Sequence, residues 1–223
     1  MSEALSLAIS ETQAVSALLD SPASPRAVYV FAHSAGAGMT QPFMAQFAAG
    51  LAERDIATLR YQFAYMESGS KRPDPPKLAH AAVRAAAAEA HARFPQLPIV
   101  AGGKSFGGRM TSQAQALEPM PGVVGVAFIA FPLHPAGKPS DERAKHLDDV
   151  RIPMLFLSGT NDALAELDLL RPVVQRLGTR ATLHLLEHAD HSFHVLARTG
   201  RKDAQVLEEA LDAFAAWVQA LLN

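Results

Sequence analysis

The chain has 223 residues, carries a formal net charge of −2 and is 49% apolar. This size and composition predict one packed domain over residues 1–223, and they exclude a disordered or fibrous chain. Lys and Arg are scattered rather than clustered, so neither nucleic acid nor a membrane surface is expected as a partner.

Cysteine does not occur in the sequence. This excludes disulfides, thiolate nucleophiles and cysteine-based zinc sites, and it fits a reducing compartment. No run approaches the roughly 18 apolar residues of a membrane span, and the acidic N-terminus lacks the pattern of a signal peptide. We therefore expect a cytoplasmic protein that does not insert into a membrane.

Strand-like and helix-like patterns alternate along the chain. Residues 5–9 alternate between apolar and polar and form a candidate edge strand, whereas the later strand candidates are continuous apolar runs, as buried parallel strands require. Apolar residues at helical spacing separate these runs. In chain order, further strands are expected at 27–32, 56–61, 98–102, 123–131, 153–158 and 181–186, and helices at 39–54, 78–94, 109–117, 164–177 and 203–222.

This alternation predicts an α/β fold with a mostly parallel central sheet and helices on both of its faces. No segment is large enough to form a separate lid domain. Residues 64–77 contain three prolines and are too long for a simple connector. Two interpretations stay open for this segment: it overhangs a site, or it is a solvated loop.

The sequence from Gly103 to Gly107 has the pattern G-x-S-x-G, with Ser105 at its centre. An expected strand precedes it and an expected helix follows it, which is the arrangement of a nucleophile elbow. In such an elbow the serine lies on a strained turn, and a Cβ on either side would collide with a neighbouring strand or helix. Ser105 is therefore the candidate nucleophile.

A nucleophilic serine needs a base to take its proton and an acid to orient that base. Asp162 and His191 each follow an expected strand, so in a parallel sheet both lie at the same edge as Ser105. Asp162 also precedes an expected helix, and a simple capping role is its competing interpretation. The alternatives are Glu166 and Asp168 for the acid, and His188 for the base, with His184 and His194 close by in the sequence.

A metal site that includes His188 and His191 is a further alternative for this histidine cluster, since the two are three residues apart. Metal sites need a better-defined scaffold and supporting hydrogen bonds. We therefore expect no metal here.

An oxyanion hole needs two backbone N–H groups that point at the developing negative charge. We expect one from Phe106, at the start of the helix after the nucleophile, and the other from Ala35, in the small-residue loop after the strand at 27–32. Candidates for the pocket lining are His33, Ser34, Lys104 and His134. A structural role for His134, and a solvent-exposed side chain for Lys104, are the competing interpretations.

These motifs resemble those of the α/β-hydrolase superfamily, in particular its small dienelactone-hydrolase-like branch. That branch includes bacterial proteins related to testis-expressed hydrolase-like proteins and to a chromatin-complex subunit. The matching segments are 33–38, 60–67, 102–109, 131–139, 159–162 and 190–193. The resemblance implies a Ser105–His191–Asp162 triad, with Ala35 and Phe106 as oxyanion donors. One departure is that His33-Ser34-Ala35 stands where His-Gly-Ala is commoner, which implies a stiffer first oxyanion loop.

We therefore expect a serine hydrolase that cleaves an ester or related acyl bond of a small molecule through an acyl-enzyme, without a cofactor. Esters, thioesters, lactones and amides share this machinery, so the type of bond stays open. The alternative function is a non-catalytic interaction module that keeps the same fold.

Overall fold

The computed structural model describes residues 2–223, which form alternating strands and helices. The strands are β1 (Glu3–Ala8), β2 (Ala14–Asp20), β3 (Ala27–Ala32), β4 (Ile56–Tyr61), β5 (Ile99–Lys104), β6 (Val123–Ile129), β7 (Met154–Gly159) and β8 (Ala181–Leu186). The helices are α1 (Pro42–Ala52), α2 (Ala64–Glu67), α3 (Pro76–Arg93), α4 (Phe106–Leu117), α5 (Leu167–Leu177) and α6 (Asp203–Leu221).

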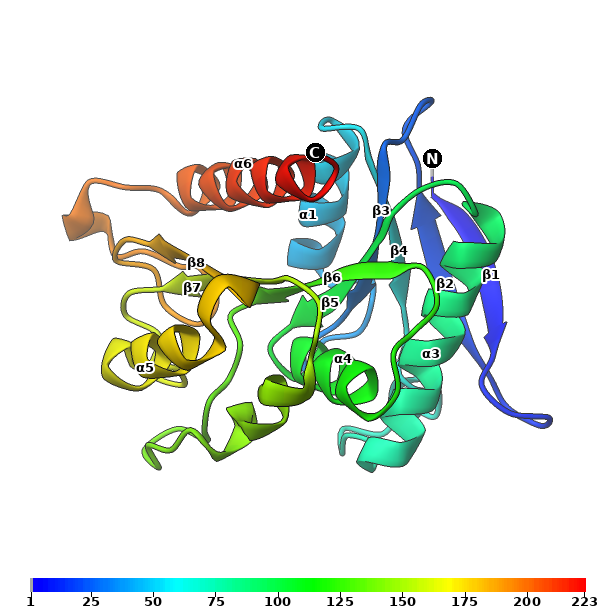
Figure 1. Cartoon of the computed structure of the whole chain (residues 1–223), viewed down its shortest axis with the longest axis horizontal. Helices are drawn as coiled ribbons and strands as arrows, with labels where there is room; N and C mark the ends of the chain where they lie inside the picture. The colour runs from blue at the N-terminus through cyan, green and yellow to red at the C-terminus, as the bar shows by residue number, and fades with distance from the viewer. Residues whose placement is uncertain (1) are drawn as a thin grey trace.

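All eight strands belong to one sheet, and helices cover both of its faces (Figure 1). The strand order is β1-β2-β4-β3-β5-β6-β7-β8. Strands β3 to β8 run parallel, whereas β1 and β2 form an antiparallel hairpin at one edge. The expected α/β fold is confirmed, and no separate lid domain is present in the described part of the chain. Among the same residues, no helix is long and apolar enough to cross a membrane.

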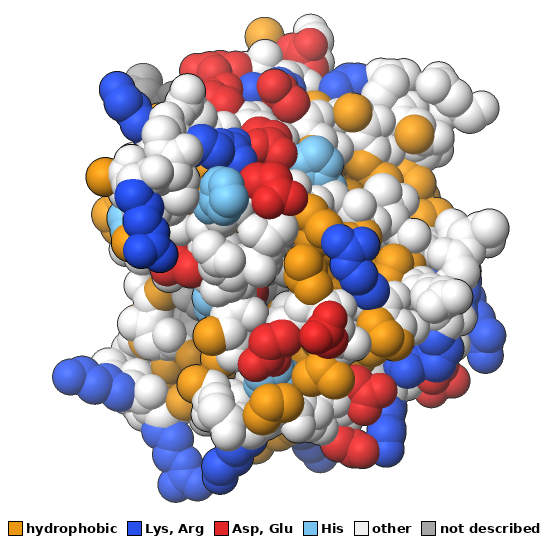
Figure 2. Space-filling model, turned by 90° about the vertical axis from the view of Figure 1, so that its left-hand side faces the viewer, with side chains coloured by type: hydrophobic (Ala, Val, Ile, Leu, Met, Phe, Trp, Pro, Cys, Tyr) orange, Lys and Arg blue, Asp and Glu red, His pale blue; other side chains and the backbone are white. Residues whose placement is uncertain are grey.

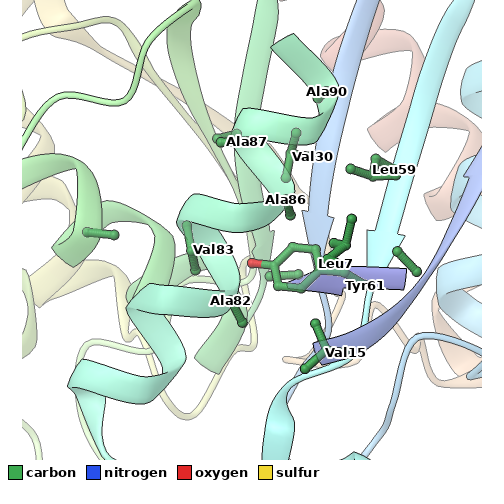
Figure 3. Packing of buried hydrophobic residues seen from close by; sticks show 14 of the residues in the cluster. Leu7, Val15, Val30, Leu59, Tyr61, Ala82, Val83, Ala86, Ala87 and Ala90 are labelled. Carbon is green, nitrogen blue, oxygen red and sulfur yellow. The ribbon is translucent and has the colours of Figure 1, made fainter. Parts of the chain in front are cut away.

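The two faces of the sheet are filled by different kinds of side chain. On β3, Tyr29 packs with Phe214 of α6 and Phe31 packs with Phe47 of α1, while Val28 and Val30 point toward α3 on the other face. The inward side of α3 is made mostly of alanine, so the helix lies close to the strands (Figure 3). A parallel strand that is buried on both faces needs a continuous apolar run, and β3 has one.

Several elements differ from the sequence-based expectation. Strand β2 was not expected, although Val15, Ala17 and Leu19 alternate with exposed or half-buried neighbours as a half-buried strand requires. A 3₁₀-helix at Glu142–Asp149 was not expected either. The segment 64–77 contains α2 and the start of α3, where Pro76 fits the first helical position because it needs no N–H partner there.

The ends of other elements shift by a few residues. The helix expected at 39–54 spans 42–52 and starts with a proline, and the helix expected at 164–177 begins only at residue 167. The strand expected at 98–102 runs to residue 104, and the helix expected from 109 already begins at 106. The strand expected to reach 131 ends at 129. These shifts leave the order of elements unchanged.

Candidate active site

Ser105 is the single residue between the end of β5 and the start of α4. Its backbone angles are φ 51° and ψ −114°, a region that side-chain-bearing residues rarely adopt. The N–H of Ser105 donates to the carbonyl oxygen of Ile129 at 3.0 Å, which ties the turn to the end of β6. The strained turn therefore holds the serine side chain above the carboxyl edge of the sheet.

The glycines beside Ser105 fit because they have no side chain. A Cβ on Gly103 would lie 2.6 Å from the carbonyl oxygen of Ala32 and 2.7 Å from backbone atoms of Gly107 and Gly108. A Cβ on Gly107 would also lie 2.6 Å from that oxygen of Ala32. The elbow is thus packed directly against the end of β3, as expected from the pattern.

Replacing Gly103 with Ala is expected to lower the free energy of unfolding by about 3 kcal/mol, because rigid backbone atoms surround the new methyl group. Gly200→Ala is the matched control: its φ is 73°, but open space surrounds the added Cβ. That change should cost only about 1–2 kcal/mol from the left-handed backbone. Urea unfolding of both variants measures the difference. Equal losses would contradict the packing argument.

The structure brings Ser105, His191 and Asp162 together from three separate loops. Nε2 of His191 lies 2.8 Å from Oγ of Ser105, and Nδ1 lies 2.8 Å from Oδ2 of Asp162. The other oxygen of Asp162 accepts the N–H of Leu164 at 2.8 Å. The side chain of Asp162 is fully buried, whereas that of His191 is 23% exposed. This arrangement permits proton transfer between the serine hydroxyl and the imidazole.

The other histidines of this region have different partners. Nε2 of His184 contacts Glu209 at 3.1 Å, and Nδ1 of His194 contacts Asp203 at 2.9 Å. The ion pair with Asp203 raises the pKa of His194, through its hydrogen bond first and its charge second. His188 is exposed and is held through its backbone by Thr160. Among residues 2–223, no group of three or more His, Cys, Asp or Glu is placed to hold a metal ion.

The two fallback acids lie away from His191. Glu166 is the residue before the first turn of α5, and its carboxylate contacts Nε2 of His134. Asp168 is exposed in the first turn of the same helix. The geometry therefore favours Asp162 as the partner of His191.

The loop after β3 carries Ala35, and hydrogen bonds of the buried His33 side chain hold this loop in place. His33 is fully buried, its Nδ1–H donates to the Ser34 carbonyl oxygen at 2.8 Å, and its Nε2 accepts the Phe63 N–H at 3.1 Å. Burial lowers the pKa of His33 to about 4, partly opposed by the bond to Ser34. A neutral imidazole with both nitrogens in use fixes the loop, and neither His33 nor Ser34 lines the cavity beside Ser105.

The N–H groups of Ala35 and Phe106 have no hydrogen-bond partner among the described residues. Phe106 is the first residue of α4, where a backbone N–H has no partner within the helix. The next N–H of the first loop, from Gly36, instead donates to the Tyr65 hydroxyl at 2.8 Å. The pair that the sequence indicates for an oxyanion hole is therefore free to bind a ligand.

Lys104 is buried, in contrast to the solvent-exposed side chain considered from the sequence. Its Nζ donates to the His191 carbonyl oxygen at 3.2 Å and lies 4.3 Å from the ring centre of Phe43 and 5.0 Å from that of Phe193. Burial lowers the pKa of Lys104 to about 8, although the charges of Asp162 and Asp190 oppose the shift. Lys104 thus lies beneath the loop that carries His191 and does not line the cavity beside Ser105.

Replacing Lys104 with Met is expected to stabilise the protein most at neutral pH. Below about pH 8, Lys104 is protonated in both the folded and the unfolded wild type. The folded state then carries the full free-energy cost of burying the ammonium group. Between pH 8 and pH 10.5, the ordinary pKa of a lysine, Lys104 keeps its proton only in the unfolded wild type. The stability of the wild type should therefore rise relative to Lys104→Met by about 1.4 kcal/mol per pH unit.

Urea unfolding at pH 7 and pH 9.5 tests this expectation. The advantage of Lys104→Met should shrink as the pH rises, whereas Lys71→Met, at an exposed lysine, should show no such change. A stability difference for Lys104→Met that is the same at both pH values would contradict the burial of a charged lysine.

A cavity of about 570 Å³ lies beside Ser105. Ala35, Phe106 and His134 are among its lining residues, and Pro73, Asp74 and Pro76 bring the segment 64–77 to its rim. This favours the overhanging interpretation of that segment. His134 is fully buried, with Nδ1 facing the Pro135 carbonyl oxygen at 2.9 Å and Nε2 facing Glu166, so both ring nitrogens have acceptors.

A larger hollow of about 1010 Å³ lies elsewhere, between α6 and the edge strand β8. Hydrophobic side chains are exposed among charged ones at this end of the molecule (Figure 2). None of Ser105, Asp162 and His191 lines this groove. We therefore place the candidate site at the smaller cavity, where the reactive groups lie.

Two arginines of the cavity were not assigned a role from the sequence: Arg109 and Arg143. Arg109 follows Ser105 by four residues, which is one turn of the expected helix. This spacing could have indicated that Arg109 lies on the same side of the helix as the nucleophile. Arg143 lies in the 3₁₀-helix that the sequence did not predict, so no local pattern connected it with the site.

Comparison with known proteins agrees with this architecture. Residues 25–219 match the family model described as an alpha/beta hydrolase domain. Dienelactone hydrolase from Anabaena variabilis has a similar structure, with a TM-score of 0.79, 20% identity, and coverage of 99% of this chain and 97% of that chain.

Two further solved structures are also similar. One is XC6422 from Xanthomonas campestris, described as an α/β serine hydrolase without lid, with a TM-score of 0.74, 22% identity, and coverage of 95% of this chain and 92% of that one. The other is the esterase domain of a Rhodothermus marinus protein, with a TM-score of 0.75, 15% identity, and coverage of 99% and 98%. At these identities the structural matches support the fold, while the family model covers most of the chain. The chain belongs to the α/β-hydrolase family.

Proposed function

We propose that this protein is a serine hydrolase that cleaves an ester or a related acyl bond in a small molecule. The observation that supports this most directly is the unbroken series of hydrogen bonds from Asp162 through His191 to Ser105, with 2.8 Å at each step. A base within hydrogen-bond reach of a hydroxyl, and itself oriented by a buried carboxylate, is what nucleophilic catalysis by serine requires.

In the first half of the reaction, Oγ of Ser105 attacks the carbonyl carbon while Nε2 of His191 takes the hydroxyl proton. The N–H groups of Ala35 and Phe106 bind the resulting oxyanion, each worth about 3–4 kcal/mol in the transition state. When the tetrahedral intermediate collapses, the bond to the leaving group breaks and His191 gives the proton to that group. The product of this half is an acyl-enzyme on Ser105.

In the second half, water attacks the acyl-enzyme and His191 takes a proton from it. Collapse of the second intermediate releases the acid and returns the proton to Ser105. Asp162 keeps the Nδ1 proton in place, so that Nε2 presents its lone pair to Ser105 or to water. The scheme needs no cofactor.

Two observations support this function over a non-catalytic module. The cavity beside Ser105 has room for a small substrate, and the N–H groups of Ala35 and Phe106 have no other partner among residues 2–223. A dienelactone hydrolase and an esterase domain are among the similar structures. The lack of cysteine supports a cytoplasmic location as part of the same proposal.

Hydrolysis of short p-nitrophenyl esters tests the proposal. Wild type is expected to release p-nitrophenol far faster than Ser105→Ala. Ser192→Ala is the matched control, because this exposed serine lies beside His191 in the sequence and only its backbone N–H is used, by Asp190. If wild type and Ser105→Ala hydrolyse ester, thioester, lactone and amide substrates equally slowly, the interaction module becomes the better interpretation.

A further inference from the structure

Two arginines reach the cavity beside Ser105 from different elements. Arg109 lies one helical turn beyond the nucleophile, because its N–H donates to the Ser105 carbonyl oxygen at 3.2 Å. Arg143 comes from the 3₁₀-helix Glu142–Asp149. Both side chains are half-buried, and both line the same cavity as Ser105. Any substrate that reaches Ser105 therefore lies close to two guanidinium groups.

Within the described part of the chain, neither guanidinium has a hydrogen-bonding or ion-pair partner, although that of Arg109 lies 5.9 Å from the ring centre of Phe106. Nε of Arg109 is buried without a hydrogen bond, and no ion pair is formed by Arg109 or Arg143 among residues 2–223. Elsewhere a buried arginine is paired: Arg60 binds Asp20 at 2.7 Å. Burying an unpaired charge costs free energy unless a ligand supplies the partner.

The arginine charges act on each other rather than on a carboxylate. Burial, and then the like charge of Arg143, hold the pKa of Arg109 below its ordinary value, and burial does the same for Arg143. Both groups stay charged, because a guanidinium does not lose its proton in proteins. Two like charges that share one cavity favour an anion between them.

The other titratable groups near the cavity already have partners. The carboxylate of Asp74 accepts the N–H of Tyr65 at 3.1 Å at the start of α2, and His134 contacts Glu166. His146 lies next to Arg109, but burial and then the charge of Arg109 lower its pKa to about 4, and its Nε2 bonds to Ser112. None of these groups forms an ion pair with Arg109 or Arg143.

We propose that Arg109 and Arg143 form an anion subsite, so that the preferred substrate is an ester or related acyl compound with a carboxylate or phosphate on its acyl or leaving group. This inference rests on the proposed hydrolase function. A guanidinium binds either anion through paired, charge-assisted hydrogen bonds. Phe106, Met110 and Leu164 line the same cavity and offer apolar surface for the carbons that link the anion to the scissile bond. A neutral substrate would leave both charges unpaired.

Matched pairs of esters test the subsite. Mono-p-nitrophenyl glutarate and p-nitrophenyl pentanoate have acyl chains of the same length, with and without a carboxylate. 4-Acetoxybenzoate, 4-acetoxyphenyl phosphate and phenyl acetate make the same comparison on the leaving group. Wild type is expected to favour at least one anionic ester by about 10- to 100-fold in kcat/KM, as for a charge-assisted hydrogen bond. Equal kcat/KM values in every pair would overturn the proposal.

Variants assign the preference to the two arginines. In Arg109→Gln and Arg143→Gln the ratio of anionic to neutral kcat/KM should fall at least about tenfold, mostly through KM, and Arg109→Lys should restore part of it. Arg151→Gln is the matched control, since that side chain is 76% exposed and lies outside the cavity. A ratio that stays at the wild-type value in both glutamine variants would overturn the assignment.

A binding measurement separates this proposal from the proposed function. Calorimetry with glutarate and with inorganic phosphate should show binding to wild type and to Ser105→Ala, and none to the Arg109→Gln/Arg143→Gln double variant. Arginine-dependent binding without turnover of any ester would support the subsite and contradict the hydrolase. Turnover of neutral esters without anion binding or preference would support the hydrolase and overturn the subsite. The tighter of the two anions identifies the substrate group.

Discussion

Ser105→Ala is expected to lower kcat for a substrate ester by about 10⁶-fold, and His191→Ala by a similar factor. The two residues act as one unit, because His191 has no proton to take without the Ser105 hydroxyl, and the hydroxyl is a weak nucleophile without the base. The double variant should therefore be no slower than either single variant. The rate that remains comes from substrate binding and the N–H groups of Ala35 and Phe106.

Steady-state hydrolysis by the two single variants and the double variant measures this non-additivity. His194→Ala is the matched control from the same loop, since its exposed ring pairs with Asp203 and lies away from Ser105. It should keep the wild-type rate. Losses that multiply in the double variant, or a His191→Ala variant near the wild-type rate, would contradict the assignment of His191 as the base for Ser105.

Asp162→Asn is expected to lower kcat by about 10⁴-fold while the fold stays intact. The amide oxygen of Asn can still accept the Leu164 N–H, which Asp162 accepts at 2.8 Å. Its NH₂ group would then donate to Nδ1 of His191 and leave the ring proton on Nε2, facing Ser105. A ring in that tautomer presents no lone pair to the serine hydroxyl, so the base is lost.

The measurement is kcat against pH for wild type, Asp162→Asn and Asp168→Asn. Asp168 is the matched control, because it lies six residues further along the chain and is exposed. Asp168→Asn should follow the wild-type profile. If Asp162→Asn retained most of the activity, a different acid would orient His191, and Glu166 would be tested next despite its contact with His134.

The parts of the fold that sequence predicts well are those where local pattern and tertiary role coincide. The continuous apolar run of β3 predicts a strand that is buried on both faces, and it is one. The glycines at 103 and 107 predict a turn with no room for side chains, and both lie against the end of β3. The order of serine, acid and base along the chain then indicates the same triad that the geometry brings together.

The parts that sequence analysis missed depend on partners far away in the chain. Strand β2 buries only alternate residues, and its place in the sheet comes from pairing with β1 and β4. From the sequence, Lys104 is either a pocket-lining or a solvent-exposed side chain, yet Phe43 and Phe193 cover it from two other segments. A lysine next to a nucleophile has no local feature that predicts such burial, so only the folded chain identifies it.

The same holds for the cavity. Neither Arg109 nor Arg143 has a neighbour in the sequence that indicates a shared role, and 34 positions of chain separate them. They meet because the 3₁₀-helix Glu142–Asp149 packs against α4. His33 shows the reverse case: its position suggested a pocket residue, but the bond from the Phe63 N–H holds it beneath the loop. Substrate recognition is thus the feature that sequence reasoning alone describes least.

Covalent labelling tests most directly whether Ser105 is an activated nucleophile. The protein is incubated with a fluorophosphonate, digested and analysed by peptide mass spectrometry. We predict one phosphonyl adduct per chain, on the peptide that contains Ser105, with labelling greatly slowed in His191→Ala and absent in Ser105→Ala. No adduct on the wild type, or an adduct on another serine that persists in Ser105→Ala, would contradict the account.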